Sequence, residues 1–246
     1  MIAGIASQYD ALRDALKAAV DTSEPAIRLR HRRDETLELP PLGDSFLDRC
    51  RMPLGRLVGL SEAGVIAICS ARRGEGRSSV AAALARLLSR SRGSGGVLLL
   101  DLDFTNPAQA HMHSVAPSPG LADYFEGRER LRAVAGGPGK HLWLITAGTR
   151  LGDPARLFHT LASDSLLGAF RQCFDWVVLD LPPLLGNPEA AALAAQADWP
   201  VLVGRHRRTT IADVRAVREL LGEEKRAAFL LTGDRARIPS WIRRLL

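Results

Sequence analysis

The sequence predicts an α/β fold, a doubly wound and mostly parallel sheet with helices on both faces. Three observations lead to this prediction. Short apolar runs alternate with helical patterns from residue 65 onward, which is typical of parallel strands buried on both sides. A turn rich in glycine joins the first run to an apolar helix pattern. Two later runs end in aspartates, at the edge of a parallel sheet where ligands bind.

Six segments have the length and apolar composition of strands. They are residues 65–70, 97–102, 142–146, 176–181, 200–204 and 227–231. Helices are predicted between most of them, and two helix starts carry their own signals. Asn187 followed by Pro188 predicts a cap and a first-turn proline, and Thr210 with Asp213 predicts a capping box.

The stretch VIAICSARRGEGRSS, residues 65–79, predicts a phosphate-binding loop between a strand and a helix. Glycines in such a loop let successive backbone N–H groups point into one concavity, and the helix N-terminus adds its positive end. We expect this loop to hold ATP or ADP. The residues predicted to contact the nucleotide are Arg73, Gly74, Glu75, Gly76, Arg77, Ser78 and Ser79.

Two residues depart from the pattern G-x-x-x-x-G-K-[ST] that defines such loops. Ala71 replaces the first glycine, and Arg77 replaces the lysine. Lysine is a compact charge on a flexible stem, whereas arginine carries a planar fork that does not fit every lysine slot. The sequence therefore predicts a retained cradle and leaves its chemistry open.

Carboxylates follow two of the predicted strands. Asp101 and Asp103 end the second strand, and Asp180 ends the fourth. Because the carboxyl ends of parallel strands meet at one edge, we expect all three side chains to face the loop. With the Ser78 hydroxyl they are the predicted Mg²⁺ ligands, and they are the candidate catalytic residues if the protein is an active enzyme.

Composition predicts one globular domain with short appendages, because 46% of the residues are hydrophobic and 24% are charged. We divide the chain into an amphipathic helix and charged linker (1–60), a nucleotide-binding domain (61–233) and a basic amphipathic tail (234–246). Without a signal peptide or a long apolar segment, a cytoplasmic location is expected. The cysteines Cys50, Cys69 and Cys173 are far apart in sequence and are expected to be buried thiols.

The net charge of +6 comes from the end of the chain, where residues 204–246 carry eleven Lys or Arg against five Asp or Glu. This excess is consistent with a solvated surface or with an acidic partner, anionic lipid or nucleic acid. In the tail, Trp241, Ile242, Leu245 and Leu246 share one helical face, which would pack on the domain or contact a membrane surface. The segment His111-Met112-His113 is predicted to be a loop and not a metal site.

Taken together, these motifs resemble the bacterial tyrosine kinase family, cytoplasmic ATPases of capsule and exopolysaccharide assembly that are related to the MinD and ParA ATPases. The family's Walker A motif falls on residues 70–79, its paired-aspartate motif on 101–107 and its Walker B motif on 177–183. Segments 120–127, 144–148 and 208–210 also resemble the family. The resemblance implies a P-loop fold, ATP or ADP with Mg²⁺, a membrane-spanning co-polymerase as partner, and homo-oligomers.

Three positions differ from the family pattern: Arg77 stands in place of the loop lysine, Thr105 in place of an arginine, and Leu181 in place of a threonine or serine. The family phosphorylates tyrosines clustered in its C-terminal tail, but the tyrosines of this sequence are Tyr9 and Tyr124. Arg72 matches a second loop lysine that crosses a dimer interface in MinD-like ATPases, although a solvated arginine also fits.

Three functional hypotheses follow from this comparison. The first is a kinase-like nucleotide-binding protein, a pseudokinase if transfer activity is lost, that regulates polysaccharide polymerisation and export at the inner face of the membrane. The second is an active ATPase or tyrosine kinase of the same pathway, with Arg77 in the role of the lysine. The third is a positioning ATPase that binds membrane or DNA, with nucleic acid the less expected partner.

Overall fold

The computed structural model describes residues 63–90, 96–129, 131, 133–136, 141–149, 151–162 and 164–233. The predicted N-terminal helix and linker, Cys50 and the C-terminal tail lie outside these residues. None of the helices in the described ranges is long and apolar enough to span a membrane.

Within the described residues, seven strands form one sheet in the order β3-β4-β2-β5-β1-β6-β7. The pairs are parallel except for β3 with β4, which is antiparallel. The mostly parallel sheet is therefore confirmed, and only β3 was not predicted. The strands are β1 Gly64–Ser70, β2 Val97–Asp101, β3 Val134–Gly136, β4 Leu142–Ile145, β5 Trp176–Asp180, β6 Trp199–Arg205 and β7 Ala228–Thr232.

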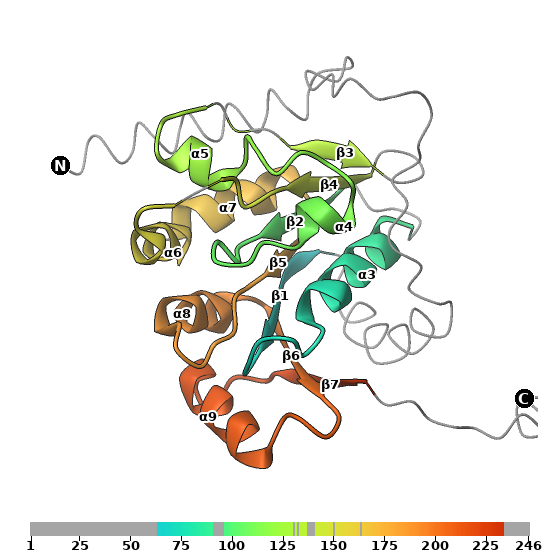
Figure 1. The fold of residues 1–246 in the computed structure, drawn as a ribbon, viewed down its shortest axis with the longest axis vertical. Helices are drawn as coiled ribbons and strands as arrows, with labels where there is room; N and C mark the ends of the chain where they lie inside the picture. Colours follow the sequence, from blue (N-terminus) through green and yellow to red (C-terminus); the bar gives the residue numbers. More distant parts are fainter. Residues whose placement is uncertain are drawn as a thin grey trace, which may run out of the picture.

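Helices cover both faces of this sheet, as predicted (Figure 1). Helix α3 packs on one face, and α6 to α9 pack on the other. Successive side chains of a strand point to opposite faces, so each face has its own apolar layer for these helices to cover. The helices are α3 Arg77–Ser89, α4 Gln109–Met112, α5 Leu121–Phe125, α6 Pro154–Ala162, α7 Asp164–Cys173, α8 Pro188–Gln196 and α9 Ile211–Leu221.

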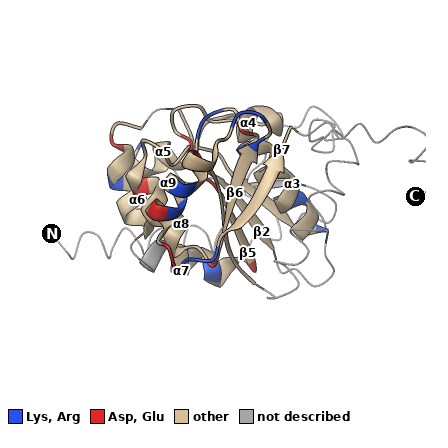
Figure 2. Cartoon of the chain, turned by 90° about the horizontal axis from the view of Figure 1, so that it is seen from below, with Lys and Arg blue, Asp and Glu red and all other residues tan. Residues whose placement is uncertain are grey.

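The strands are almost free of charge, and the charged residues lie on the surrounding helices and loops (Figure 2). Strand β1 is buried at every position, as are β2 and β5. These three strands are adjacent at the centre of the sheet, so two apolar layers sandwich them. Asp101 and Asp180, each the last residue of its strand, are the charged residues of these three strands.

The two predicted helix starts have different outcomes. Thr210 accepts a hydrogen bond from the Asp213 amide at 3.1 Å, and Asp213 accepts one from the Thr210 amide at 3.1 Å, so the capping box is confirmed. Pro188 begins α8 as expected, but the Asn187 side chain does not cap it. It donates instead to the Pro183 carbonyl at 2.7 Å and closes the turn before the helix.

The segment at residues 111–113 is only partly the loop that the sequence predicted. His111 and Met112 lie in the short helix α4, and the His113 ring is buried with Nδ1 at 2.9 Å from the Gln109 carbonyl oxygen. Cys69 is a buried free thiol, as expected, and burial raises its pKa to about 12. Cys173 is a thiol that is only half-buried.

A tight contact joins two loops at the carboxyl end of β4. Asp123 accepts hydrogen bonds from the Gly120 amide at 2.9 Å and from the Thr149 hydroxyl at 2.7 Å. The backbone of Gly120 lies so close to its neighbours that an added Cβ would be 2.3 Å from the Gly148 nitrogen. Glycine is therefore required at position 120 for steric reasons.

We predict that Gly120→Ala destabilises the protein by about 2 kcal/mol or more, because overpacking against rigid backbone forces the two loops apart. Chemical denaturation measures this change. The matched control is Gly168→Ala in α7, where an added Cβ meets nothing within 4 Å. That variant is expected to be as stable as the natural protein or more stable, since alanine favours helix. Equal stability of the two variants would contradict the prediction.

Candidate functional site

The phosphate-loop residues lie at the carboxyl edge of the sheet, between β1 and α3. The register pairs Ile68 of β1 with Asp180 of β5, and Asp180 with Asp101 of β2. The end of β1 therefore enters the loop directly beside the two strand-terminal aspartates. The topology brings together the residues that the sequence predicted would meet.

The backbone of the loop has the shape of an anion cradle. Gly74 and Gly76 have φ values of +77° and +91°, a conformation that favours glycine. Within the described residues, no backbone N–H group of residues 73–79 donates a hydrogen bond to the protein. These donors open at the N-terminus of a 13-residue helix, where the partial charge favours a phosphate.

The tip of the loop is held by residues from the far edge of the sheet. The buried Glu75 carboxylate accepts hydrogen bonds from the Arg72 amide at 2.8 Å and from the Thr209 hydroxyl. The Thr232 hydroxyl donates to the Glu75 carbonyl at 2.6 Å, and Arg205 donates to the Gly74 carbonyl at 2.9 Å. The loop shape is thus fixed by β6, β7 and the turn before α9.

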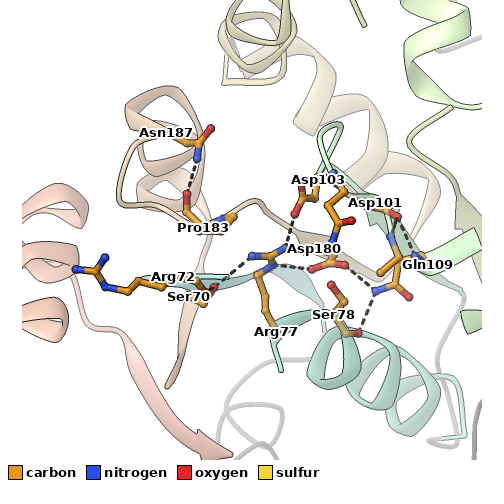
Figure 3. A network of polar contacts seen from close by, with 12 residues as sticks. Ser70, Arg72, Arg77, Ser78, Asp101, Asp103, Gln109, Asp180, Pro183 and Asn187 are labelled. Atoms are coloured by element: carbon orange, nitrogen blue, oxygen red, sulfur yellow. Dashed lines mark hydrogen bonds and ion pairs between the residues drawn. The ribbon is translucent and has the colours of Figure 1, made fainter. Parts of the chain in front are cut away.

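Arg77 is buried, with 8% of its surface exposed, and its guanidinium lies among the ends of three strands (Figure 3). Its Nε donates to Asp180 Oδ1 at 3.1 Å, and Nη2 donates to Asp103 Oδ2 at 2.8 Å. Its Nη1 donates to the Ser70 hydroxyl at 3.2 Å. All three nitrogens are therefore engaged by the protein.

Asp180 is completely buried and has a partner for each oxygen. Besides Arg77, it accepts a hydrogen bond from Gln109 Nε2 at 2.7 Å, and Ser78 bonds to it as well. Burial raises the pKa of Asp180, while the charge of Arg77 and the hydrogen bonds from Gln109 and Ser78 oppose that rise. Gln109 also donates to the Ser78 carbonyl at 3.0 Å, so one amide links α3 to the end of β5.

Asp101 organises the loop that follows β2. It accepts hydrogen bonds from the amides of Asp103 at 3.2 Å, Ala108 at 3.1 Å and Gln109 at 2.9 Å. Burial raises the pKa of Asp101 to about 7, and the nearby charge of Asp180 adds to that rise. Its contacts thus turn its oxygens toward its own loop and away from Arg77.

Arg72 has an ion-pair partner within its own chain. Neither of the two interpretations offered from the sequence, a dimer contact and a solvated arginine, included this partner. Its Nε donates to Asp213 at 3.0 Å, and its Nη2 lies 2.9 Å from the same oxygen. This hydrogen bond holds the pKa of Asp213 below its usual value. The side chain is nonetheless 61% exposed, so it remains accessible from outside the loop.

The carboxylates do not fit a Mg²⁺ ion while Arg77 stands in this position. Asp103 and Asp180 each give an oxygen to the guanidinium, and Asp101 serves backbone amides. No group of three or more His, Cys, Asp or Glu side chains in the described ranges is arranged to hold a metal. The predicted metal ligands are therefore neighbours, but their oxygens already have protein partners, namely the Arg77 guanidinium and backbone amides.

Comparison with curated proteins gives relatives that match more than half of the chain. The putative tyrosine-protein kinase EpsB of Ralstonia solanacearum is 32% identical over 145 residues, which cover 58% of this chain and 19% of EpsB. The succinoglycan biosynthesis transport protein ExoP of Rhizobium meliloti is 32% identical over 178 residues, 71% of this chain and 22% of ExoP. The chain is a homologue of the bacterial tyrosine kinases. It matches only about a fifth of the length of these two relatives, and no family model matches it.

Solved structures agree on the fold. The kinase domain of the Escherichia coli tyrosine kinase Etk superposes with a TM-score of 0.71 at 22% identity, covering 86% of each chain. A ParA family ATPase from Chlorobium tepidum gives a TM-score of 0.53 at 20% identity, covering 74% of this chain and 78% of its own. The fold is therefore that of the bacterial tyrosine kinases and the ParA-like ATPases.

Sequence reasoning found the loop and the aspartates but missed three contributors to the site. Gln109 carries no pattern that marks it, since a glutamine after a proline-containing turn is common on protein surfaces. Thr209 belonged to a segment noted only for its family resemblance, and Thr232 ends an edge strand. Each reaches the loop through tertiary contacts that local patterns do not encode.

We predict a specific pH dependence for Asp101. Because its pKa in the folded protein is about 7 and its ordinary value is 3.8, the folded state keeps a proton that the unfolded chain releases. The resulting stabilisation is present at low pH and is lost as the pH rises toward 7. Asp101→Asn should remove a slope of up to about 1.4 kcal/mol per pH unit in the free energy of unfolding between roughly pH 4 and 7. Urea titrations across this range measure it, and parallel profiles for the two proteins would contradict it.

Proposed function

We propose that this protein is a kinase-like regulatory subunit of exopolysaccharide or capsule assembly that binds a nucleotide without transferring its phosphoryl group. The observation that carries the proposal is the position of Arg77. In phosphoryl transfer the loop lysine contacts the phosphates of the nucleotide. Here the arginine at that place is held by Asp103 and Asp180, so it can meet a bound phosphate but cannot follow the transferred phosphoryl group as a flexible lysine can.

Loss of phosphoryl transfer is supported by the size of the energy that one misplaced charge contact costs. Removing one positioned charge contact from a transition state costs about 3 kcal/mol, or a rate factor of about 10² to 10³. Thr105 and Leu181 also differ from the family pattern, so the deficits accumulate. The sequence contains two tyrosines, and Tyr124 is a half-buried residue of α5.

Binding of ATP or ADP is supported by the open cradle. The donors at residues 73–79 remain free of protein partners in the described part of the chain, and Glu75 fixes the loop in place. We propose Arg73, Gly74, Glu75, Gly76, Arg77, Ser78 and Ser79 as the phosphate-binding residues.

The place of this protein in a polysaccharide machine is proposed from its relatives. ExoP is named as a succinoglycan biosynthesis transport protein. We propose that this chain works at the inner face of the membrane, beside a membrane-spanning co-polymerase that senses its nucleotide state. Homo-oligomers, and contact of residues 241–246 with the membrane surface, belong to the same proposal.

We predict no catalytic turnover that depends on the site. With Mg·ATP and a tyrosine-containing peptide, the natural protein and Asp180→Asn should give the same rates of ATP hydrolysis and peptide phosphorylation. Thermal unfolding of both proteins serves as the control that each is folded. The active-enzyme hypothesis instead requires Mg²⁺-dependent turnover that falls about tenfold or more in Asp180→Asn; that result would overturn the pseudokinase part of the proposal.

The regulatory role has its own test. Deleting the gene should change the amount or the chain length of the exported polysaccharide, and reintroducing the natural gene should restore both. An unchanged polymer after deletion would remove the proposed pathway. Salt-sensitive DNA binding by the purified protein would favour the positioning-ATPase hypothesis instead.

A further inference from the structure

The guanidinium of Arg77 lies between Asp103 and Asp180, two of the side chains predicted to bind Mg²⁺, and it contacts one oxygen of each. We infer that the phosphates of a nucleoside di- or triphosphate bind this loop without a divalent cation, an inference that rests on the proposed nucleotide binding. Mg²⁺ normally bridges phosphate oxygens to protein carboxylates and neutralises both. In this site both carboxylates already have a cationic partner from the protein, the guanidinium of Arg77.

The guanidinium is fixed from three directions. Ser70 comes from the end of β1, Asp103 from the loop after β2, and Asp180 from the end of β5 (Figure 3). Because a guanidinium is planar with donors at fixed angles, three such contacts determine its orientation. A side chain held in this way does not swing aside as a flexible lysine would.

Entry of a cation would have to break this arrangement. The exposed fraction is 8% for the Arg77 side chain, 3% for Asp103 and 0% for Asp180. Taking one partner from a buried ion pair leaves an uncompensated charge, which is strongly destabilising. A divalent cation that entered beside Arg77 would face a like charge in a site shielded from water. Both effects exclude the metal and leave the arginine in place.

The phosphate side of the site stays open. The free amides of residues 73–79 lie at the start of α3, the helix that Arg77 itself begins. Nη1 and Nη2 of Arg77 each carry a second hydrogen beyond the one that the protein engages. These hydrogens can approach a phosphate oxygen while the ion pairs persist. Arg205, which donates to the Gly74 carbonyl, adds positive charge at the outer side of the loop.

The test is a calorimetric titration of the full chain with ADP, first in excess MgCl₂ and then in excess EDTA. We expect dissociation constants that agree within about threefold, since the cation makes no required contact. Titration with MgCl₂ alone is expected to give no binding heat. These titrations use the natural protein, so the test of the inference does not depend on whether a variant folds.

Arg77→Lys is the matched variant. Its point charge cannot hold both carboxylates in the bidentate manner of arginine, so a cation should regain access. We expect ADP affinity of the variant to fall about tenfold or more when Mg²⁺ is replaced by EDTA. Thermal unfolding reports whether the variant is folded.

The outcomes separate this inference from the proposed function. Binding of ADP to the natural protein in Mg²⁺ but not in EDTA would overturn the inference and leave nucleotide binding intact. No binding in either buffer would overturn nucleotide binding as well, and Arg77 would then close the site. The inference is supported if the natural protein binds ADP equally in both buffers and the Arg77→Lys variant binds ADP more weakly in EDTA than in Mg²⁺.

Discussion

A buried arginine between two buried aspartates is the interaction on which the site depends. Without the Arg77 guanidinium, Asp103 and Asp180 would lie together out of water, with like charges that the surrounding apolar layers cannot screen. The ion pairs join the first residue of α3 to the ends of two strands. They therefore connect the helix on one face of the sheet to the edge where the ligand would bind, and they set the geometry of every nearby group.

The same edge is supported by a second set of contacts on the other side of the loop. Glu75 is buried, yet its carboxylate is satisfied by the Arg72 amide and the Thr209 hydroxyl. Thr232 and Arg205 bond to carbonyl oxygens of the loop and leave its amides free. Because these carbonyls are used and the amides of residues 73–79 are not, within the described part of the chain, the loop presents donors to a ligand. This selective use of its backbone groups is what makes the loop favour anionic ligands.

The sequence predicted the architecture because the central strands are apolar on both faces and helices separate them. It did not predict β3, a three-residue strand whose pairing with β4 is antiparallel and depends on the neighbour, not on its own composition. The aspartates were expected together because strand ends must meet in a parallel sheet. The direction of the Arg77 fork was not predictable, because it is chosen by the hydroxyl of Ser70 and the carboxylates around it. Gln109 was missed for a related reason: its role exists only once β5 and α3 are adjacent.

The three departures from the family pattern are physically consistent with one another. At position 105 an arginine of the family pattern is replaced by an exposed threonine, while at position 77 a lysine is replaced by a buried arginine. In this chain the arginine thus lies between the carboxylates and not in the loop after β2. Leu181 follows Asp180 with a side chain packed in the apolar core, where the family pattern has a hydroxyl. A hydroxyl would add a polar group beside Asp180, whose oxygens already have Arg77, Gln109 and Ser78 as partners. With the carboxylate satisfied from inside the protein, an apolar residue at 181 gains core packing and leaves no polar group without a partner.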